Sequence, residues 1–301
     1  MNDKLILEFH PRTKGILLVV ISSMFWGISG PIAQYLFQYK NISPEWLTDI
    51  RLLSSGIIFL ILLYFKKGKK IFDIWKSKYG RRHIILFSTF GLIGTQYGYF
   101  VCIKYGNAAT ATILQYLSPV IIVFYLAIYS KKLPSPREYL SIILALLGTF
   151  FIVTKGNIHS LAISNSALFW GILSAFAAAF YVLQPFYIIK KWGCDIVIGW
   201  GMLLGGLAFS FVHPAWEIKG QYNFNSILGI LFIIVFGTLL SFYWYSASTK
   251  YIKASETSLL SCIEPLSATI VSIMWLNIPF GASDIIGGIC IVSTVVVLSY
   301  K

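Results

Sequence analysis

Ten apolar runs, each about twenty residues long, place the strongest constraint on what this chain can fold into. A helix needs roughly 20 mostly apolar residues to cross the hydrocarbon core of a bilayer. Inside a bilayer the backbone must satisfy its own hydrogen bonds, so each run predicts a transmembrane helix. We therefore expect an all-α membrane protein with ten transmembrane helices at about residues 15–37, 44–65, 83–103, 108–129, 137–154, 165–189, 196–213, 225–248, 255–277 and 281–299.

The composition favours a lipid surrounding over an aqueous one. Hydrophobic residues make up 57% of the chain and charged residues 12%, whereas a soluble domain carries about 25% charged residues. The net charge of +13 could indicate a nucleic-acid-binding protein, but the basic residues punctuate the apolar runs and form no single patch. The four cysteines and four histidines show no metal-ligand spacing, so we expect no metal, no cofactor and no nucleic-acid partner.

The basic residues also predict an orientation, because cytoplasmic loops are enriched in Lys and Arg. If the N-terminus is cytoplasmic, the inside segments hold 19 of the 24 Lys and Arg residues. The outside segments hold four, which are Lys40, Lys104, Lys155 and Lys219. Segment 66–82 is the most basic, and we interpret it as a topology signal in preference to a lipid-head-group site. We expect a multi-pass protein of the cell membrane with both termini in the cytoplasm.

The chain contains an internal repeat. Segment 91–119 aligns without a gap on segment 237–265 at a constant offset of 146 residues. The identical pairs are Gly91/Gly237, Tyr97/Tyr243, Tyr99/Tyr245, Lys104/Lys250, Tyr105/Tyr251, Ala108/Ala254, Leu114/Leu260 and Pro119/Pro265. Chance similarity between aromatic-rich helices does not account for an ungapped match of this length.

This repeat predicts two halves that are inverted relative to each other. It maps the third and fourth predicted helices onto the eighth and ninth, which gives five helices per half. An odd number of crossings reverses the orientation of the second half, and such inverted repeats are common in secondary transporters. We expect one five-helix repeat in residues 1–155 and a second in residues 156–301.

Four of the ten prolines fall inside predicted helices, namely Pro31, Pro119, Pro185 and Pro265. They lie in helices 1, 4, 6 and 9, which correspond as 1 with 6 and 4 with 9 under the repeat. A proline inside a helix removes one backbone hydrogen bond and bends the helix. Transmembrane helices can tolerate proline without a functional reason. Matched interruptions in two halves nevertheless point to a central binding site, and we expect these prolines to act as hinges.

With these features on hand, the sequence resembles the drug/metabolite transporter superfamily, in its EamA-type branch. The resemblance is carried by Phe25-Trp26-Gly27, by Ser43-Pro44-Glu45-Trp46 followed by Arg51, by Ala108-Ala109-Thr110 leading to Leu117-Ser118-Pro119, and by Ala254-Ser255-Glu256-Thr257 leading to Ile263-Glu264-Pro265. It covers nearly the whole chain. It implies ten helices in two five-helix repeats and the transport of amino acids, amines, other metabolites or drugs, often outward.

Few charged residues fall inside the predicted helices, where a charge is costly and often functional. Glu264 lies near the middle of helix 9, where it could bind a proton or a cationic substrate, or could instead bond to a neighbouring helix. Arg51 lies in helix 2 and could meet a substrate carboxylate, form a structural or gating ion pair, or snorkel to the interface. Asp49 could pair with Arg51, although residues two apart do not share a helix face.

Polar and aromatic side chains within the helices are candidates for the substrate pathway. Glutamine amides need partners in a membrane, and tyrosine and tryptophan faces can hold organic cations. For the aromatic residues, a place in an interfacial belt is the alternative. The candidates, besides Glu264, are Trp26, Gln34, Gln96, Tyr99, Gln115, Ser118, Tyr181, Gln184, Tyr243 and Tyr245.

From these features we expect a secondary transporter, specifically an exporter of a small organic metabolite such as an amino acid or amine. It would work by alternating access, and proton coupling through Glu264 is a further hypothesis. Three alternatives remain: an importer of an organic cation, a membrane-embedded enzyme, and a channel. The sequence shows no paired catalytic groups and no phosphate-binding loop, which disfavours an enzyme or an ATP-driven pump. The expected partners are a small-molecule substrate, the lipid bilayer and protons, in a monomer or homodimer.

Overall fold

The computed structural model describes residues 11–131, 133–157, 161–252, 256–257 and 260–299. Within these ranges every regular element is a helix and no strand occurs. The elements are α1 (Pro11–Tyr39), α2 (Pro44–Lys67), η1 (Gly68–Phe72), α3 (Asp73–Lys76), α4 (Lys78–Leu86), η2 (Phe87–Ile93), α5 (Gly94–Tyr105), α6 (Ala108–Gln115), α7 (Ser118–Ser130), α8 (Pro136–Thr154), α9 (Asn165–Leu183), α10 (Phe186–Trp192), α11 (Cys194–Phe209), α12 (Phe224–Ile234), η3 (Val235–Leu240), α13 (Ser241–Ser248), α15 (Ile263–Leu276) and α16 (Ala282–Ser299).

Among the described residues, seven helical stretches are long and apolar enough to cross a membrane. They are Pro11–Tyr39, Pro44–Lys76, Lys78–Tyr105, Ala108–Ser130, Pro136–Thr154, Asn165–Leu183 and Phe224–Ser248. An eighth is formed by α10 and α11 if this pair, bent by 118°, counts as one span. Two shorter apolar helices, Ile263–Leu276 and Ala282–Leu298, complete the chain. The protein is therefore an all-helical, multi-pass membrane protein, and the tenfold crossing stays a prediction.

Three of the predicted helices are interrupted, and one of them, 255–277, breaks at the turn Ser261–Cys262 just before α15. The predicted helix 165–189 divides into α9 and α10 at Gln184–Pro185, and the predicted helix 108–129 divides into α6 and α7 at Tyr116–Leu117. In each case a proline lies at the start of the second piece, where its missing N–H removes the bond that would continue the helix. The beginning of the predicted helix 255–277, including residue 255, and the repeat residue Ala254 lie outside the described residues.

Polar N-caps fix where several helices begin. The Ser43 hydroxyl accepts a hydrogen bond from the Trp46 N–H at 3.0 Å, with Pro44 as the first helical residue. Before α8, Ser135 and Glu138 form a capping box, in which the Glu138 carboxylate accepts the Ser135 N–H at 2.5 Å. Such caps satisfy N–H groups that have no partner within the helix. They explain why short, polar turns suffice between the apolar runs.

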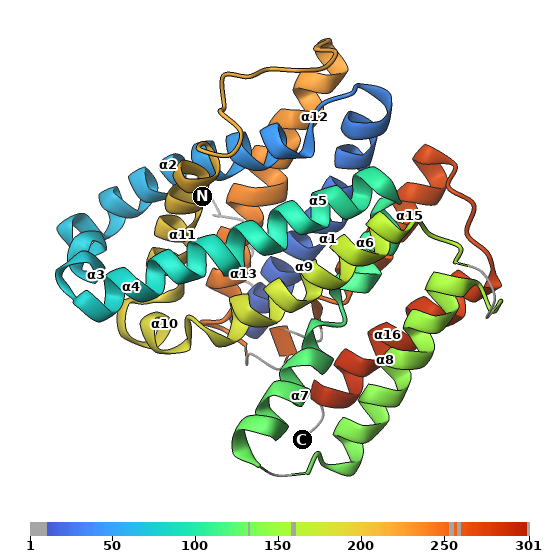
Figure 1. The fold of residues 1–301 in the computed structure, drawn as a ribbon. Helices are drawn as coiled ribbons and strands as arrows, with labels where there is room; N and C mark the ends of the chain where they lie inside the picture. The colour runs from blue at the N-terminus through green and yellow to red at the C-terminus, as the bar shows by residue number, and fades with distance from the viewer. Residues whose placement is uncertain (1–10, 132, 158–160, 253–255, 258–259, 300–301) are drawn as a thin grey trace, which may run out of the picture.

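Much of the helix packing is between helices that lie side by side in pairs. In Figure 1, α8 and α16 lie side by side, as do α5 and α9, and α2 packs along α11. The α8–α16 pair is close because each helix presents a glycine to the other: a Cβ on Gly148 or on Gly287 would lie 2.8 Å from the carbonyl oxygen of the other glycine. Small residues that let helix backbones approach are the usual means of packing in a membrane.

The contacts of α1 show that it runs in the same direction as α5. Gly30 of α1 lies against the hydroxyl of Tyr99, since a Cβ there would be 2.6 Å from that oxygen. Further along α1, the Gln38 amide donates to the Ile103 carbonyl at 3.2 Å. Ile103 follows Tyr99 in α5. Contact positions therefore advance together along the two helices.

The same helix runs opposite to α13. Early in α1, Gly15 lies against Tyr251, just beyond the end of α13: a Cβ placed on Gly15 would be 2.7 Å from the Tyr251 Cβ. Later in α1, the Ser22 carbonyl accepts a hydrogen bond from the Ser241 hydroxyl, at the start of α13, at 3.1 Å. It follows that α5 and α13, which contain the aligned segments of the internal repeat, point in opposite directions.

Both of these helices are preceded by a π-helical segment. η2 covers Phe87–Ile93 before α5, and η3 covers Val235–Leu240 before α13. Subtracting the offset of 146 places η3 on residues 89–94, so the two segments overlap in the repeat. π-Helical turns are rare and are frequently found near functional sites.

The outer surface carries many large apolar side chains. Phe65, Ile128, Phe211 and Met274 are 77% exposed or more, and they come from different helices or their ends. A soluble monomer rarely exposes continuous apolar surface of this kind. Lipid contact accounts for it, and the polar side chains gather inside the helical bundle instead.

Candidate functional site

A cavity of about 480 Å³ lies among the helices of both halves. Its wall takes residues from α1, α2, α5, α9, α13, α15 and α16, and from the break between α6 and α7. Volumes of this size are typical of sites for small organic ligands. Of the predicted pathway residues, those on the wall are Trp26, Gln96, Tyr99, Gln115, Ser118, Tyr181, Tyr245 and Glu264, and the wall also includes Arg51 and Pro119.

The two halves contribute to this cavity at matching positions. At the offset of 146, four pairs have both members on the wall. These pairs are Gln96/Phe242, Tyr99/Tyr245, Gln115/Ser261 and Ser118/Glu264. The cavity therefore lies where the equivalent surfaces of the two repeats face each other.

Arg51 is the cationic group of the wall, and it is only 3% exposed. Its guanidinium carbon lies 4.6 Å from the ring centroid of Phe100, which is the geometry of a cation–π contact. Its Nε atom is buried and has no hydrogen-bond partner. Within the described ranges no carboxylate oxygen lies within 4.0 Å of Arg51, so Asp49 is not its ion-pair partner, in line with residues two apart not sharing a helix face.

Glu264 lies in the first turn of α15 and belongs to a small polar group at the helix break. The Tyr116 hydroxyl donates to the Glu264 carboxylate at 3.2 Å and to the Ser261 carbonyl at 2.6 Å. Tyr116 itself lies at the break between α6 and α7. The hydroxyl thus connects the interrupted helices of the two halves, and no Lys, Arg or His of the described chain lies within 4.0 Å of Glu264.

Aromatic rings form much of the remaining wall. Trp26 packs edge-on against Phe242 at 5.0 Å between ring centroids and lies 5.2 Å from Tyr245. On another side, the Tyr99 hydroxyl shares a hydrogen bond of 2.8 Å with the Thr112 hydroxyl. These rings are held by packing and hydrogen bonds within the bundle, so they offer a rigid apolar and π-rich surface to a ligand.

Two of the predicted glutamines have structural partners outside the cavity wall. The Gln34 side-chain oxygen accepts the N–H of Ala108 at 2.9 Å, and its amide nitrogen donates to Gln38 at 3.0 Å. Gln184 donates to the carbonyl of His83 at 3.0 Å. The Gln34 oxygen satisfies the first N–H of α6, whereas the His83 carbonyl that Gln184 contacts also accepts the Phe87 N–H of its own helical stretch.

Tyr243 and Asp49 also lie outside the wall. Tyr243 is 37% exposed, and the Lys66 ammonium lies 5.8 Å from its ring centroid, which places it on the outer surface near a helix end. Asp49 is fully buried, and the Ser210 hydroxyl donates to its carboxylate, lying 3.0 Å from each of the two oxygens. Residues two apart in a helix differ by about 200° around its axis, so periodicity separates Tyr243 from Tyr245 but does not tell which of them faces the cavity.

The four prolines differ in what they do to their helices. Pro31 lies inside the continuous helix α1, whereas Pro119 and Pro185 follow breaks of the helix, and Pro265 is the third residue of α15. Pro119 alone of the four contributes to the cavity wall. Their role as hinges stays a prediction.

Several wall residues were not among the candidates, notably Thr95, Tyr116, Phe242 and Ser261. The repeat contains the signal for two of them, since Phe242 and Ser261 occupy the positions that correspond to Gln96 and Gln115. No group of three or more His, Cys, Asp or Glu residues suited to a metal ion is present in the part of the chain that the structure describes. Chemically, the wall can bind a ligand through one cation, one carboxyl group, amides, hydroxyls and aromatic faces.

Comparison with known proteins gives consistent matches over the full length. The model of the EamA-like transporter family matches residues 13–154 and again residues 165–300. The "uncharacterized inner membrane transporter YicL" of Salmonella typhimurium is 40% identical over 289 residues, which is 95% of each chain. The "uncharacterized transporter YyaM" of Bacillus subtilis is 24% identical, over 92% of this chain and 90% of its own. A solved crystal structure superimposes with a TM-score of 0.60 at 16% identity, covering 96% of this chain and 94% of that chain, which shows a shared fold.

Proposed function

Because this chain belongs to the EamA-like transporter family, we propose that it is a secondary transporter that exports a small organic metabolite, such as an amino acid or amine, by alternating access. The observation that carries the proposal is the cavity between the halves, whose wall is built from matching positions of the internal repeat. A site on the axis that relates two repeats can be reached from either side when the halves exchange conformations.

We further propose that all ten apolar segments cross the membrane as two inverted five-helix repeats, 1–155 and 156–301, with both termini in the cytoplasm. The opposite directions of α5 and α13 support the inversion. The packing supports it too. α2 packs on α11, which are the second and seventh predicted helices, and α8 packs on α16, which are the fifth and tenth. Each pair therefore joins two helices that correspond under the repeat. The uneven distribution of Lys and Arg supports the orientation.

The helix breaks next to the cavity give the motion a physical basis. At Tyr116–Leu117 the chain leaves the helical path between α6 and α7, and Pro119 prevents the normal backbone bond from forming there. A matching proline, Pro265, lies close to Glu264 in the second half. Because fewer backbone hydrogen bonds hold these points, we propose that the helices bend there as the cavity opens to one side and closes to the other.

Coupling to protons through Glu264 is the finer part of the proposal. A carboxyl group inside the bundle can exchange a proton for a substrate if only one of them occupies the site at a time. The absence of a cation within 4.0 Å, among the residues that the structure describes, leaves Glu264 available for this exchange. The family and its relatives favour a transporter over an enzyme, and a cavity lined by matching positions of the two repeats favours a carrier over a channel.

The test is transport by the purified protein in proteoliposomes. Metabolite mixtures would be loaded on one side, and solutes that exchange across the membrane would be identified by mass spectrometry. A carrier gives saturable counterflow of a limited set of solutes. Non-saturable conductance would support a channel, and a covalently altered product would support an enzyme; either result would reject the carrier.

A further inference from the structure

We infer that the cavity selects a small zwitterion and holds it in one orientation, with its carboxylate on Arg51 and its ammonium group on Glu264. This inference rests on the proposed transport function and names the substrate class of the same site. Its starting point is a departure from the internal symmetry of the cavity. The aromatic pair Tyr99/Tyr245 is identical in the two halves, whereas each charged residue has a neutral counterpart.

The counterparts follow from the offset of 146. Arg51 corresponds to Val197 in α11, and Glu264 corresponds to Ser118 at the start of α7. A fully symmetric wall would accept an elongated ligand equally well in two orientations. One cation contributed by the first half and one carboxyl group contributed by the second half remove this ambiguity, since reversing a dipolar ligand would place like charges together.

Among the described residues, neither charge has an ion-pair partner within 4.0 Å. Arg51 is 3% exposed, its Nε atom has no partner, and its guanidinium is held over Phe100 without a carboxylate within 4.0 Å. Glu264 accepts a single hydrogen bond, of 3.2 Å, from the Tyr116 hydroxyl. Charges inside a membrane bundle are costly, and they usually pair with each other or serve a ligand or ion.

A zwitterion satisfies both groups at once. A carboxylate can accept two parallel hydrogen bonds from the planar guanidinium of Arg51. An ammonium group can donate to Glu264, and the faces of Trp26, Tyr181 and Tyr245 surround the apolar remainder. A purely cationic amine would leave Arg51 unmatched, and a purely anionic acid would leave Glu264 unmatched. A buried charge without its partner carries a large penalty, so both should be rejected.

The experiment compares three sets of probes in proteoliposome counterflow: the neutral amino acids, their amides, and their N-acetyl derivatives. The amides lack the carboxylate and the N-acetyl derivatives lack the ammonium group. We expect at least one neutral amino acid to be exchanged about tenfold or more faster than its amide and its N-acetyl derivative. Arg51→Gln should reduce the preference over the amide, and Glu264→Gln should reduce the preference over the N-acetyl derivative.

Matched controls carry the same chemical changes away from the cavity. Lys219→Gln and Glu217→Gln alter an exposed pair in the loop before α12, and they should leave both preferences unchanged. If Arg51→Gln does not fold, as judged by size-exclusion chromatography, Arg51→Lys keeps the charge but loses the planar fork. That variant should slow exchange of the amino acid and retain its preference over the amide.

The outcomes separate the two proposals. Equal exchange of an amino acid and its amide or N-acetyl derivative would overturn the zwitterion inference and leave the carrier intact. So would exchange of other metabolites with none of the amino acids. Failure to exchange any solute from a broad metabolite mixture would reject the carrier itself.

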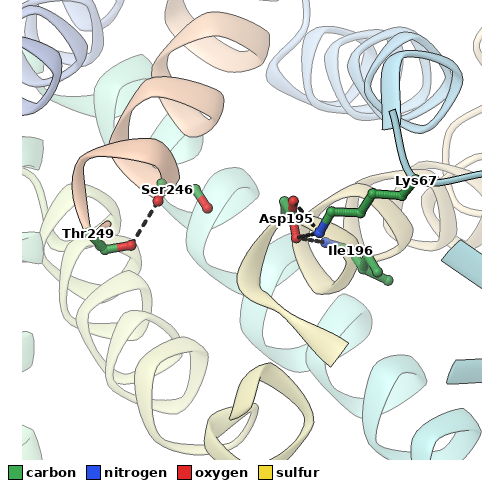
Figure 2. Close-up of polar contacts among 5 residues, drawn as sticks. All are labelled: Lys67, Asp195, Ile196, Ser246 and Thr249. Atoms are coloured by element: carbon green, nitrogen blue, oxygen red, sulfur yellow. Dashed lines mark hydrogen bonds and ion pairs between the residues drawn. The ribbon is translucent and has the colours of Figure 1, made fainter. Parts of the chain in front are cut away.

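A second, independent observation concerns the pair α2–α11, which is tied at both ends. At one end the Lys67 ammonium lies 2.7 Å from the Asp195 carboxylate, which also accepts the Ile196 N–H at 3.0 Å. Figure 2 shows Lys67 reaching Asp195 there, while Ser246 and Thr249 form a separate contact with each other. At the other end, the Ser210 hydroxyl donates to the buried Asp49 carboxylate and lies 3.0 Å from each of its oxygens.

These two ends correspond to each other in the repeat. Asp49 corresponds to Asp195 at the offset of 146, and Lys67 corresponds to His213, which interacts electrostatically with Asp49. Each aspartate therefore meets the end of the partner helix from the other half, close to an equivalent basic residue. Two contacts in the middle of the pair are related in the same way. Gly206 approaches Leu53, and the equivalent contact under the offset of 146 is that of Gly199 with Leu60.

We propose that α2 and α11 form a fixed axle about which the two halves turn. A gate in an alternating-access carrier is closed at one end while the other end is open. The α2–α11 contacts are closed at both ends in one conformation, and the helices touch closely in between: a Cβ on Gly206 would lie 2.8 Å from the Leu53 nitrogen. Asp49 therefore serves to anchor the axle, which is a structural role and not the gating pair with Arg51 that the sequence suggested.

The test uses cross-links in a variant without the four native cysteines. Cysteine pairs at Lys67/Asp195 and at Asp49/Ser210 would be joined by a short bifunctional thiol reagent. We expect the cross-linked protein to transport at within about twofold of the reduced protein, because a joint that does not open can be locked without loss. Loss of transport on locking either end, with recovery on reduction of a cleavable cross-link, would overturn the axle.

A comparison pair gives the opposite expectation. Tyr35 of α1 and Trp275 of α15 lie 5.3 Å apart between ring centroids and join helices of different halves. Locking them with a cysteine pair should stop transport, since α1 and α15 must separate when the cavity opens. If the end pairs of the axle prevent folding, Leu60→Cys with Gly199→Cys makes the same lock in the middle of the two helices. Transport that survives the α1–α15 lock would mean that the halves do not turn, which would reject the axle together with the rocking motion.

Discussion

Replacing Gly27 with alanine tests the closest helix contact at the cavity. A Cβ at Gly27 would lie 2.5 Å from the Glu264 carbonyl oxygen, 2.7 Å from the Ser267 Cβ and 3.0 Å from the Ala268 nitrogen. Two of these three atoms belong to the backbone of α15, so they cannot move away as a flexible side chain would. Overpacking of this kind costs about 1–3 kcal/mol. Alanine in a helix recovers about 1 kcal/mol relative to glycine.

A matched control isolates the contact from the helix propensity. Gly288 lies in α16, and a Cβ there would meet only the end of the Ile113 side chain, at 3.6 Å. Gly288→Ala should therefore stabilise the protein by up to about 1 kcal/mol, because alanine favours the helix and meets no close neighbour. In Gly27→Ala the overpacking cancels or exceeds the same gain. The two variants should differ by about 2 kcal/mol in stability, which corresponds to roughly 4–8 °C in melting temperature.

The measurement is the apparent melting temperature of each purified variant in the same detergent, followed by intrinsic tryptophan fluorescence. Gly27→Ala should melt below the parent protein, and Gly288→Ala should melt at or above it. Equal melting temperatures for the two variants would show that α1 and α15 do not pack as closely as the structure has them.

Three further outcomes are expected. Glu264→Gln should abolish flux driven by an imposed pH difference while the protein remains folded, and unchanged flux would reject proton coupling through this residue. Gln34→Ala should lower the stability by about 1–3 kcal/mol, because the buried Ala108 N–H loses its acceptor; a melting temperature equal to the parent's would contradict that role. A cysteine placed at Lys219 should react with an impermeant maleimide added outside intact cells, whereas a cysteine placed at Lys69 should react only after the cells are permeabilised. The reverse pattern would overturn the predicted orientation.

The fold class was predictable because lipid imposes simple rules on sequence. Apolar runs of about twenty residues leave helices as the available structure, so the all-helical architecture follows from length and hydropathy. The sequence could not show how three of these runs are divided. A proline predicts a bend, but whether the helix continues, as at Pro31, or stops, as before Pro119, depends on whether neighbouring helices satisfy the freed groups.

The cavity was predictable in part, from the residues that are costly to place in lipid. Glu264, Arg51 and Gln115 line it, as their polarity inside apolar runs suggested. Polarity alone could not distinguish them from Gln34, which is equally polar and lies in a helix of the cavity wall but bonds to the backbone of Ala108. That distinction depends on which helix end lies opposite a side chain, and this is a property of tertiary packing.

Aromatic positions were the hardest to assign. Tyr243 and Tyr245 are two residues apart in α13, yet Tyr245 lines the cavity and Tyr243 faces outward near Lys66. A tyrosine suits a lipid interface and a polar cavity about equally, because it has an apolar ring and a polar hydroxyl. Only the rotation of the helix, which η3 changes just before α13, decides between the two.

The widened turns η2 and η3 also bear on the ancestry of the chain. One additional residue in a helix rotates everything after it by about 100°, which would exchange an inward-facing side for an outward-facing one. If such an insertion had entered only one copy after a duplication, the later parts of the two copies would no longer match in both register and facing. The turns fall on overlapping positions, so the two halves keep the same register and the same facing in α5 and α13, as expected if the insertion preceded the duplication.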